Sequence, residues 1–157
     1  MNDKELEKKV KQFTSELAYK KGYVCSVDVL IKLGYISEKE YQDWRFGKIP
    51  YLEKACQANL HKLSAVNKFI RKYSAEWNLE KSWTAYDKQG KGPKKRLIFS
   101  KSRDYQIESL YATHFLNKKR IKELRIEKQP DNTSKESIKI NQETIQLQDE
   151  NKTATTT

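Results

Sequence analysis

"PYLEKACQANLHKLSAVNKFIRKYSAEW", residues 50–77, carries the longest regular apolar pattern in this chain. Apolar side chains recur along it every three or four residues, the spacing that places them on one face of an α-helix. They are Leu52, Cys56, Leu60, Leu63, Val66, Ile70, Tyr73 and Trp77. Pro50 suits the first turn of a helix, where its missing N–H costs nothing. The pattern therefore predicts one long helix from about residue 50 to residue 77.

Three shorter helices are predicted before this stretch. An apolar stripe among lysines and glutamates predicts an amphipathic helix over about residues 3–20. Ser26 can cap a second helix, which Gly34 would end in the left-handed conformation. Ser37 opens an S-x-x-E capping box, in which the serine and glutamate side chains satisfy donors at the start of a third helix. Residues 26–45 are thus predicted to fold as helix, tight turn, helix.

The apolar period changes after the long helix. Residues 82–86 and 96–100 are short runs of β-favouring residues, separated by a glycine- and proline-containing turn. They predict a β-hairpin at about residues 81–101. Ser102 or Asp104 then caps a helix that is expected to run to about residue 127.

These elements define the expected fold class and domains. We predict a mainly helical α+β protein, a helix bundle with a helix–turn–helix-like segment and one β-hairpin, in a basic domain of residues 1–127. Residues 128–157 are predicted to be a flexible polar tail, with a two-stranded ribbon over residues 138–147 as the alternative. The order of elements is loosely similar to that of winged-helix proteins, in which a hairpin lies on the nucleic-acid backbone.

Composition and charge restrict the class of protein further. The chain has 157 residues, 36% of them apolar and 34% charged, and a net charge of +11. Residues 128–157 hold four lysines and five acids, so the positive charge lies in the predicted domain. No apolar run reaches the ~20 residues of a membrane span, and none has the length of a signal-peptide core. We therefore expect a cytoplasmic protein without a membrane partner.

Few features of the sequence indicate an enzyme. The chain has only two histidines, it contains no P-loop and no G-x-S-x-G motif, and its two cysteines match no zinc-ligand spacing. We predict reduced thiols, no metal and no cofactor. A catalytic pair formed in the folded chain by Cys25 or Cys56 with His61 or His114 stays open. The sequence favours a non-enzymatic function.

The most basic stretch is "KQGKGPKKRLIFSKSR", residues 88–103, with seven lysines and arginines in sixteen positions and no acid. Cations held on a rigid element neutralise phosphates and release counterions. We predict that the hairpin and the basic faces of two helices bind the phosphate backbone of DNA or RNA. The predicted binding residues are Lys88, Lys91, Lys94, Lys95, Arg96, Lys101, Arg103, Lys54, Lys68, Lys72, Lys118, Lys119 and Arg120.

Two aromatic residues beside the basic stretch could add contacts to the bases of a nucleic acid. Trp83 and Tyr86 flank the basic stretch and could stack on unpaired bases, as in single-strand binders. For Trp83 the favoured role is instead in the core face of the hairpin. The alternative function is that of an interaction or inhibitor module that docks an acidic protein partner.

Four sequence blocks resemble those of a family of small uncharacterised bacterial proteins. The blocks are DWRFGKIPYLE (residues 43–53), SWTAY (82–86), FSKS (99–102) and YATH (111–114). The resemblance covers roughly residues 22–116 and implies no activity and no functional residue.

Overall fold

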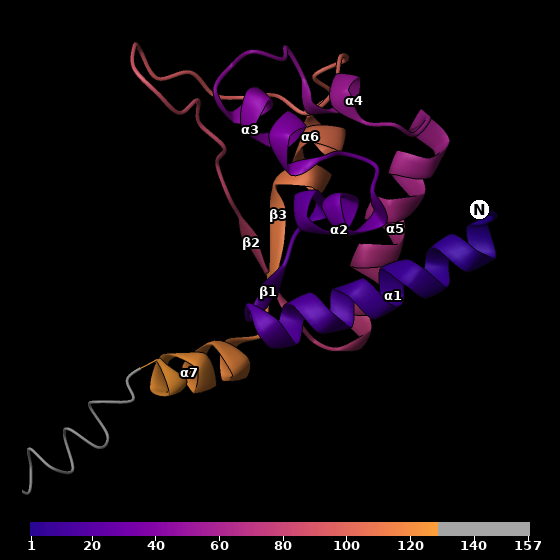
Figure 1. The fold of residues 1–157 in the computed structure, drawn as a ribbon. Coiled ribbons are helices and arrows are strands. Elements are labelled where there is room, and N and C mark those ends of the chain that lie inside the picture. Colours follow the sequence, from indigo (N-terminus) through magenta and orange to yellow (C-terminus); the bar gives the residue numbers. More distant parts are fainter. Residues whose placement is uncertain (129–157) are drawn as a thin grey trace, which may run out of the picture. The chain divides into compact units, whose positions relative to one another are not determined.

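The computed structural model describes residues 1–128 of the chain (Figure 1). These residues are mainly helical with one small sheet, which confirms the mainly helical α+β class. The elements are α1 (Asp3–Lys20), β1 (Tyr23–Val24), α2 (Ser26–Leu33), α3 (Glu38–Arg45), α4 (Leu52–Ala55), α5 (Leu60–Glu76), β2 (Glu80–Trp83), α6 (Tyr105–Ala112), β3 (Thr113–Leu116) and α7 (Lys118–Glu127). The chain divides into two compact units, Met1–Lys118 and a second that begins at Lys119. The predicted domain boundary after residue 127 stays a prediction.

The predicted helices before residue 46 are confirmed. α1 covers the expected residues, and α2 ends at Gly34, whose φ of 79° is left-handed. The Ser37 side chain accepts a hydrogen bond from the backbone N–H of Glu40, and the Glu40 side chain accepts one from the Ser37 N–H, which forms the capping box of α3. The predicted cap of α2 is wrong in one respect. Ser26 is the first residue of the helix, and its hydroxyl donates to the side chain of Asn67 on α5.

The single long helix predicted for residues 50–77 is wrong, because the chain breaks between α4 and α5. Cys56 is extended (φ −77°, ψ 138°), and the Asn59 side chain begins α5 by accepting from the backbone N–H of Lys62 at 2.9 Å. The apolar period continues across the break, since both helices bury one face in the same core. The first N–H groups of α4, those of Leu52 and Glu53, donate to the carbonyls of residues 98 and 99.

The core of the first unit forms where α1 packs on α5 and α2. Leu6 and Val10 of α1 are fully buried. On α5, the side chains with an exposed fraction of 1% or less are Leu63, Val66 and Ile70. These positions are three or four residues apart on each helix, so each helix presents one continuous apolar face. The predicted amphipathic patterns therefore correspond to the observed contact.

The sheet differs from the predicted hairpin. β3 is its middle strand and pairs antiparallel with both β1 and β2, in the order β1-β3-β2. Tyr23 lies opposite Leu116, and Trp83 lies opposite Thr113. The hairpin expected over residues 81–101 does not form as a pair of strands, because β2 pairs with β3 and residues 96–100 form no strand. One isolated bridge, between Asp87 and Arg96, joins the two runs that were expected to pair.

The helix predicted from Asp104 to residue 127 is interrupted by β3. Asp104 is the N-cap, as expected, and its carboxylate accepts from the N–H of Ile107 at 3.1 Å. α6 ends at Ala112, because Thr113 is extended and continues into the sheet. α7 then follows, and in the second unit Arg120 pairs with Glu123 and Glu127. The predicted ribbon over residues 138–147, and the predicted tail beyond Lys128, lie outside the described residues.

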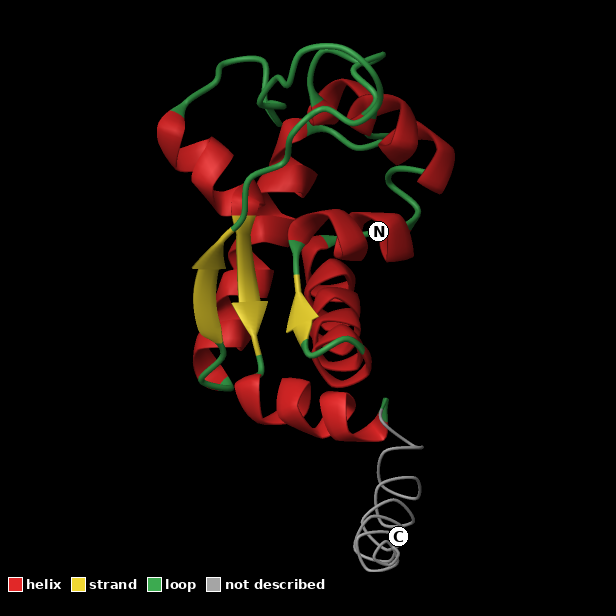
Figure 2. Ribbon diagram, turned by 90° about the vertical axis from the view of Figure 1, so that its left-hand side faces the viewer, coloured by secondary structure: helices red, strands yellow, loops and turns green. Residues whose placement is uncertain are grey.

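The irregular segments of the first unit gather at one end. Residues 46–51 and 84–104 lie there together with α3, α4 and α6, at the top of Figure 1 and Figure 2. The sheet and α5 extend away from this end, and α1 runs across them at the opposite end (Figure 1). Among residues 1–128, none of the helices combines the length and the apolar character that a membrane crossing requires.

Candidate functional site

The loop between β2 and α6, residues 84–104, carries the most basic sequence and is here called the basic loop. Two backbone hydrogen bonds of 2.8 Å close it, from Lys88 N–H to the Lys95 carbonyl and from Leu97 N–H to the Tyr86 carbonyl. The Trp44 indole on α3 donates to the carbonyl of Ile98 at 2.9 Å. On the other side of the tip, the Arg45 side chain of α3 donates to the carbonyl of Asp87 at 3.2 Å, so the loop is attached to α3 on both sides.

A carboxylate holds the end of the basic loop. Glu108 on α6 accepts from the backbone N–H groups of Phe99 (3.0 and 3.1 Å) and Ser100 (2.8 Å), and from the Ser100 hydroxyl (2.7 Å). Charge-assisted hydrogen bonds of this kind are about twice as strong as neutral ones. Lys101 and Arg103 follow directly, and Arg103 is left-handed, with φ of 59°. The two cations therefore stand on a fixed backbone.

The basic loop surrounds a cavity of about 450 Å³, here called the basic pocket. Five cations line it, and no acidic residue does; the opposite wall comes from residues 47–51. The cations are Lys88, Lys95, Arg96, Lys101 and Arg103. Among the described residues only Arg96 of these five has an ion pair, to Asp87 at 2.9 Å. The arrangement concentrates positive charge that a bound anion would neutralise.

The other predicted binding residues are dispersed. Lys91 and Lys94 are exposed on the basic loop outside the basic pocket, and Lys68 is exposed on α5. Lys72 pairs with Glu7 at 2.7 Å, and Lys118 pairs with Glu80 at 3.0 Å. Lys119 and Arg120 belong to the second unit, and Lys54 lines a different pocket. The basic stripe expected along one long helix is split between α4 and α5.

Gly47 shapes the wall of the basic pocket. Its φ is +80°, and a β-carbon placed on it would lie 3.0 Å from Cε of Lys88. We expect Gly47→Ala to destabilise the fold by about 1–2 kcal/mol and to displace the Lys88 side chain. Gly34→Ala is the matched control, because Gly34 has φ of +79° and nothing within 4 Å of the added carbon. Thermal melting should show a similar loss for both variants, whereas only Gly47→Ala should weaken anion binding. Equal anion binding by the two variants would contradict the role of this wall.

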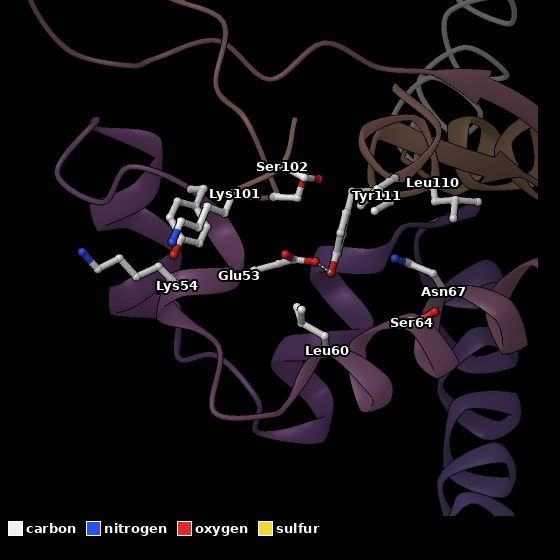
Figure 3. Close-up of a pocket in the computed structure, with 12 residues that line it drawn as sticks. Glu53, Lys54, Leu60, Ser64, Asn67, Lys101, Ser102, Leu110 and Tyr111 are labelled. Atoms are coloured by element: carbon white, nitrogen blue, oxygen red, sulfur yellow. Dashed lines mark hydrogen bonds between the residues drawn. The ribbon is translucent and has the colours of Figure 1, made fainter. Parts of the chain in front are cut away.

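A second cavity, of about 760 Å³, adjoins the basic pocket, since Tyr51 and Lys101 line both. It is here called the carboxylate pocket (Figure 3). At its centre the Tyr111 hydroxyl of α6 donates to Oε2 of Glu53 on α4 at 2.7 Å. The other lining residues are Lys54, Leu60, Ser64, Asn67, Ser100, Ser102, Ile107 and Leu110. The site thus combines one half-buried carboxylate with apolar walls and a cationic rim.

The environment of Glu53 changes its acidity. Burial raises the pKa of its carboxyl, the Tyr111 hydrogen bond lowers it, and the charge of Glu108 raises it, with a net upward direction. The carboxylate is therefore less stable in the fold than in water. Within residues 1–128 no donor is bonded to its second oxygen, Oε1, so it can accept hydrogen bonds from a ligand.

Asn67 faces Glu53 across the carboxylate pocket. Its side chain is 94% buried, at 6% exposure. Its oxygen accepts from the Ser26 hydroxyl, which leaves the amide N–H groups to donate. In Figure 3 the amide nitrogen points towards Glu53 and Tyr111. The pocket therefore presents an acceptor on one side and a donor on the other.

The aromatic residues beside the basic loop have roles opposite to those expected. Trp83, favoured for the core, is 58% exposed, and the Arg96 guanidinium lies 5.2 Å from its ring centre. Tyr86, proposed to stack on bases, is 6% exposed and bonds to the His114 ring at 2.8 Å. Trp83 lines a cavity of about 300 Å³ with Tyr105, which is 81% exposed. Trp83 and Tyr105 thus present exposed aromatic rings beside the basic loop.

The surroundings of both thiols disfavour a nucleophilic cysteine–histidine pair. Burial raises the pKa of both Cys25 and Cys56 to about 12, which is the reverse of what a nucleophilic thiolate needs. His61 pairs with Asp3 on the exposed face of α1 and α5. No group of three or more potential metal ligands occurs among residues 1–128.

No protein-family model, curated protein sequence or solved structure matches this chain. The resemblance to a bacterial family proposed above stays a prediction. Three of its four blocks contribute residues to the carboxylate pocket: Tyr51 and Glu53, Ser100 to Ser102, and Tyr111.

Proposed function

We propose that this protein binds single-stranded nucleic acid through the phosphate backbone, with the basic pocket as the contact surface. The proposal rests on one observation above all: five cations line one cavity that no acidic residue lines. Like charges held together repel one another, and bound phosphates would relieve this repulsion and release counterions. A basic patch that is merely solvated has no comparable reason to hold its cations around a cavity.

Two exposed aromatic rings favour unpaired strands over duplexes. Trp83 and Tyr105 line one cavity, and Arg96 lines both this cavity and the basic pocket. Stacking of a base on an aromatic side chain contributes about 1–3 kcal/mol and tolerates any base. A strand whose phosphates contact the basic pocket could therefore place its bases on these rings. The function is non-enzymatic in this proposal.

A charge-neutral triple variant tests the proposal. Replacing Lys88, Lys95 and Arg103 by glutamine should lower affinity for every unstructured DNA or RNA strand by roughly 10- to 100-fold. The slope of log affinity against log salt should fall by about two units. Fluorescence anisotropy over a salt series measures both.

The matched control removes the same charge from a different surface. Lys4, Lys8 and Lys9 are exposed on α1 and have no ion pair among the described residues, so their replacement by glutamine also lowers the net charge by three. This control should change affinity and slope little. If both variants bind alike, the contact is diffuse attraction rather than the basic pocket. If the wild-type protein binds no strand, the cations serve another polyanion, and an acidic protein partner becomes the leading candidate.

A further inference from the structure

The carboxylate pocket has features that phosphate binding does not use. Its volume of about 760 Å³ falls within the range of pockets that enclose small molecules. Glu53 and Asn67 both turn polar atoms towards its interior, and neither atom is bonded to the described residues. A half-buried carboxylate with a free acceptor oxygen is a ready partner for a ligand that donates hydrogen bonds.

We propose that the carboxylate pocket binds an unpaired guanine base of the strand whose phosphates occupy the basic pocket. This inference rests on the proposed function and names the base that the site selects. Guanine presents two adjacent N–H donors, N1–H and the N2 amino group, beside the acceptor O6. Glu53 can accept both donors, and the amide of Asn67, which lies across the pocket (Figure 3), can donate to the acceptors N7 or O6 on the neighbouring edge of the base.

The other bases fit this pattern less well. Adenine and cytosine each present one amino donor beside an unprotonated ring nitrogen, which would face the Glu53 carboxylate as a second acceptor. Uracil and thymine present one N–H between two carbonyl oxygens, so a carbonyl would face the carboxylate. Leaving a polar group of the pocket unpaired opposes binding of the wrong base.

The positions of the two pockets allow one nucleotide to reach both. Lys101 lies on their common rim and can contact the phosphate that leads into the carboxylate pocket. Leu60 and Leu110 supply apolar surface for the faces of the base, and Leu60 is 67% exposed. The Tyr111 hydrogen bond holds the Glu53 carboxylate in one orientation. The base is thus positioned by groups on α4, α5 and α6, all outside the basic loop.

The test compares full-length protein on oligonucleotides that differ at one base. The probes are unstructured pyrimidine strands carrying a single central guanine, inosine or adenine, measured by anisotropy at fixed salt. We expect the guanine strand to bind roughly 5- to 100-fold more tightly than the adenine strand. Inosine lacks the N2 amino group, so its strand should bind with intermediate affinity.

Two variants connect this preference to the pocket. Glu53→Gln should abolish the preference for guanine, measured as the ratio of the two affinities within the variant, because removing a negative charge beside the basic pocket raises the affinity for every strand alike. Leu60→Trp should narrow the pocket and reduce the same preference, and its melting temperature should stay near that of the wild type because Leu60 is exposed. A melting curve of Glu53→Gln separates loss of recognition from loss of folding.

Each outcome decides between the two proposals. Equal affinity for the guanine and adenine strands, with a normal salt slope, overturns the guanine pocket and leaves phosphate binding in place. A guanine preference that both folded variants retain also overturns the assignment to this pocket. Absence of binding to all strands overturns the proposed function and the guanine pocket together.

Discussion

Replacing Trp44 by alanine should destabilise the protein by about 3–5 kcal/mol, the range expected for removing a large aromatic side chain from a core. Trp44 has no exposed surface, and its ring lies 5.1 Å from that of Phe99 and 5.7 Å from that of Tyr86. Its indole N–H also donates to the Ile98 carbonyl. Because these partners belong to the basic loop, the variant should lose nucleic-acid affinity together with stability. Urea unfolding at equilibrium measures the change.

Two other tryptophan variants serve as controls for this prediction. Trp44→Phe keeps most of the ring contacts and removes one of the two donors to the Ile98 carbonyl, leaving the Leu52 N–H, so it should cost about 1–2 kcal/mol. Trp83→Ala removes an exposed ring and should cost about 0.5 kcal/mol or less. A Trp44→Ala protein as stable as the Trp83→Ala protein would show that α3 does not anchor the basic loop.

The second large effect is expected at Glu108. Replacement by alanine leaves the backbone N–H groups of Phe99 and Ser100 and the Ser100 hydroxyl without their acceptor, at a cost of about 2–4 kcal/mol. It also frees the backbone that positions Lys101 and Arg103. We therefore expect a fall in nucleic-acid affinity, measured by anisotropy below the melting transition. Differential scanning calorimetry measures the loss of stability.

The sign of the affinity change at Glu108 distinguishes two explanations. Removing a negative charge near a basic site raises the affinity for phosphate if only long-range electrostatics matter. If Glu108 instead acts by positioning Lys101 and Arg103, its removal lowers the affinity for phosphate. Glu108→Gln removes the charge but keeps one acceptor oxygen, so it should be more stable than the alanine variant and retain more of the affinity. An alanine variant with raised affinity would contradict the role of Glu108 in positioning the loop.

Local signals in the sequence predicted most of the helix ends correctly. Gly34 and the capping box of Ser37 act through neighbouring residues, so their effect is visible in the sequence itself. The break before α5 also has a local signal in the sequence. Asn59 is a favourable N-cap residue, and its side chain begins α5 in the structure. The continuous apolar period concealed it, because two helices that bury their faces in one core give the same period as one helix.

The sheet and the carboxylate pocket depend on contacts between residues far apart in the sequence. β2 pairs with residues 113–116 rather than with the nearer run at 96–100, and nothing in the local pattern decides between them. This choice of partner also exposes Trp83 and leaves Tyr86 buried. Glu53 and Tyr111 meet only after the chain has folded. The cations of the basic pocket come from one stretch of sequence, so their proximity could be predicted, whereas the cavity between them and residues 47–51 could not.

The place of β3 at the centre of the sheet has a consequence for the kinetics of folding. β1 and β2 have no contact with each other as strands, so neither can join the sheet before β3 arrives. Tyr23 can therefore pair only after Leu116 has come into place. Closing the loop between these two residues costs more entropy than forming the turns between neighbouring helices. Proteins dominated by local contacts fold fast, whereas long-range strand pairing slows folding. This chain should fold more slowly than its helical content suggests, with the arrival of its middle strand as the limiting step.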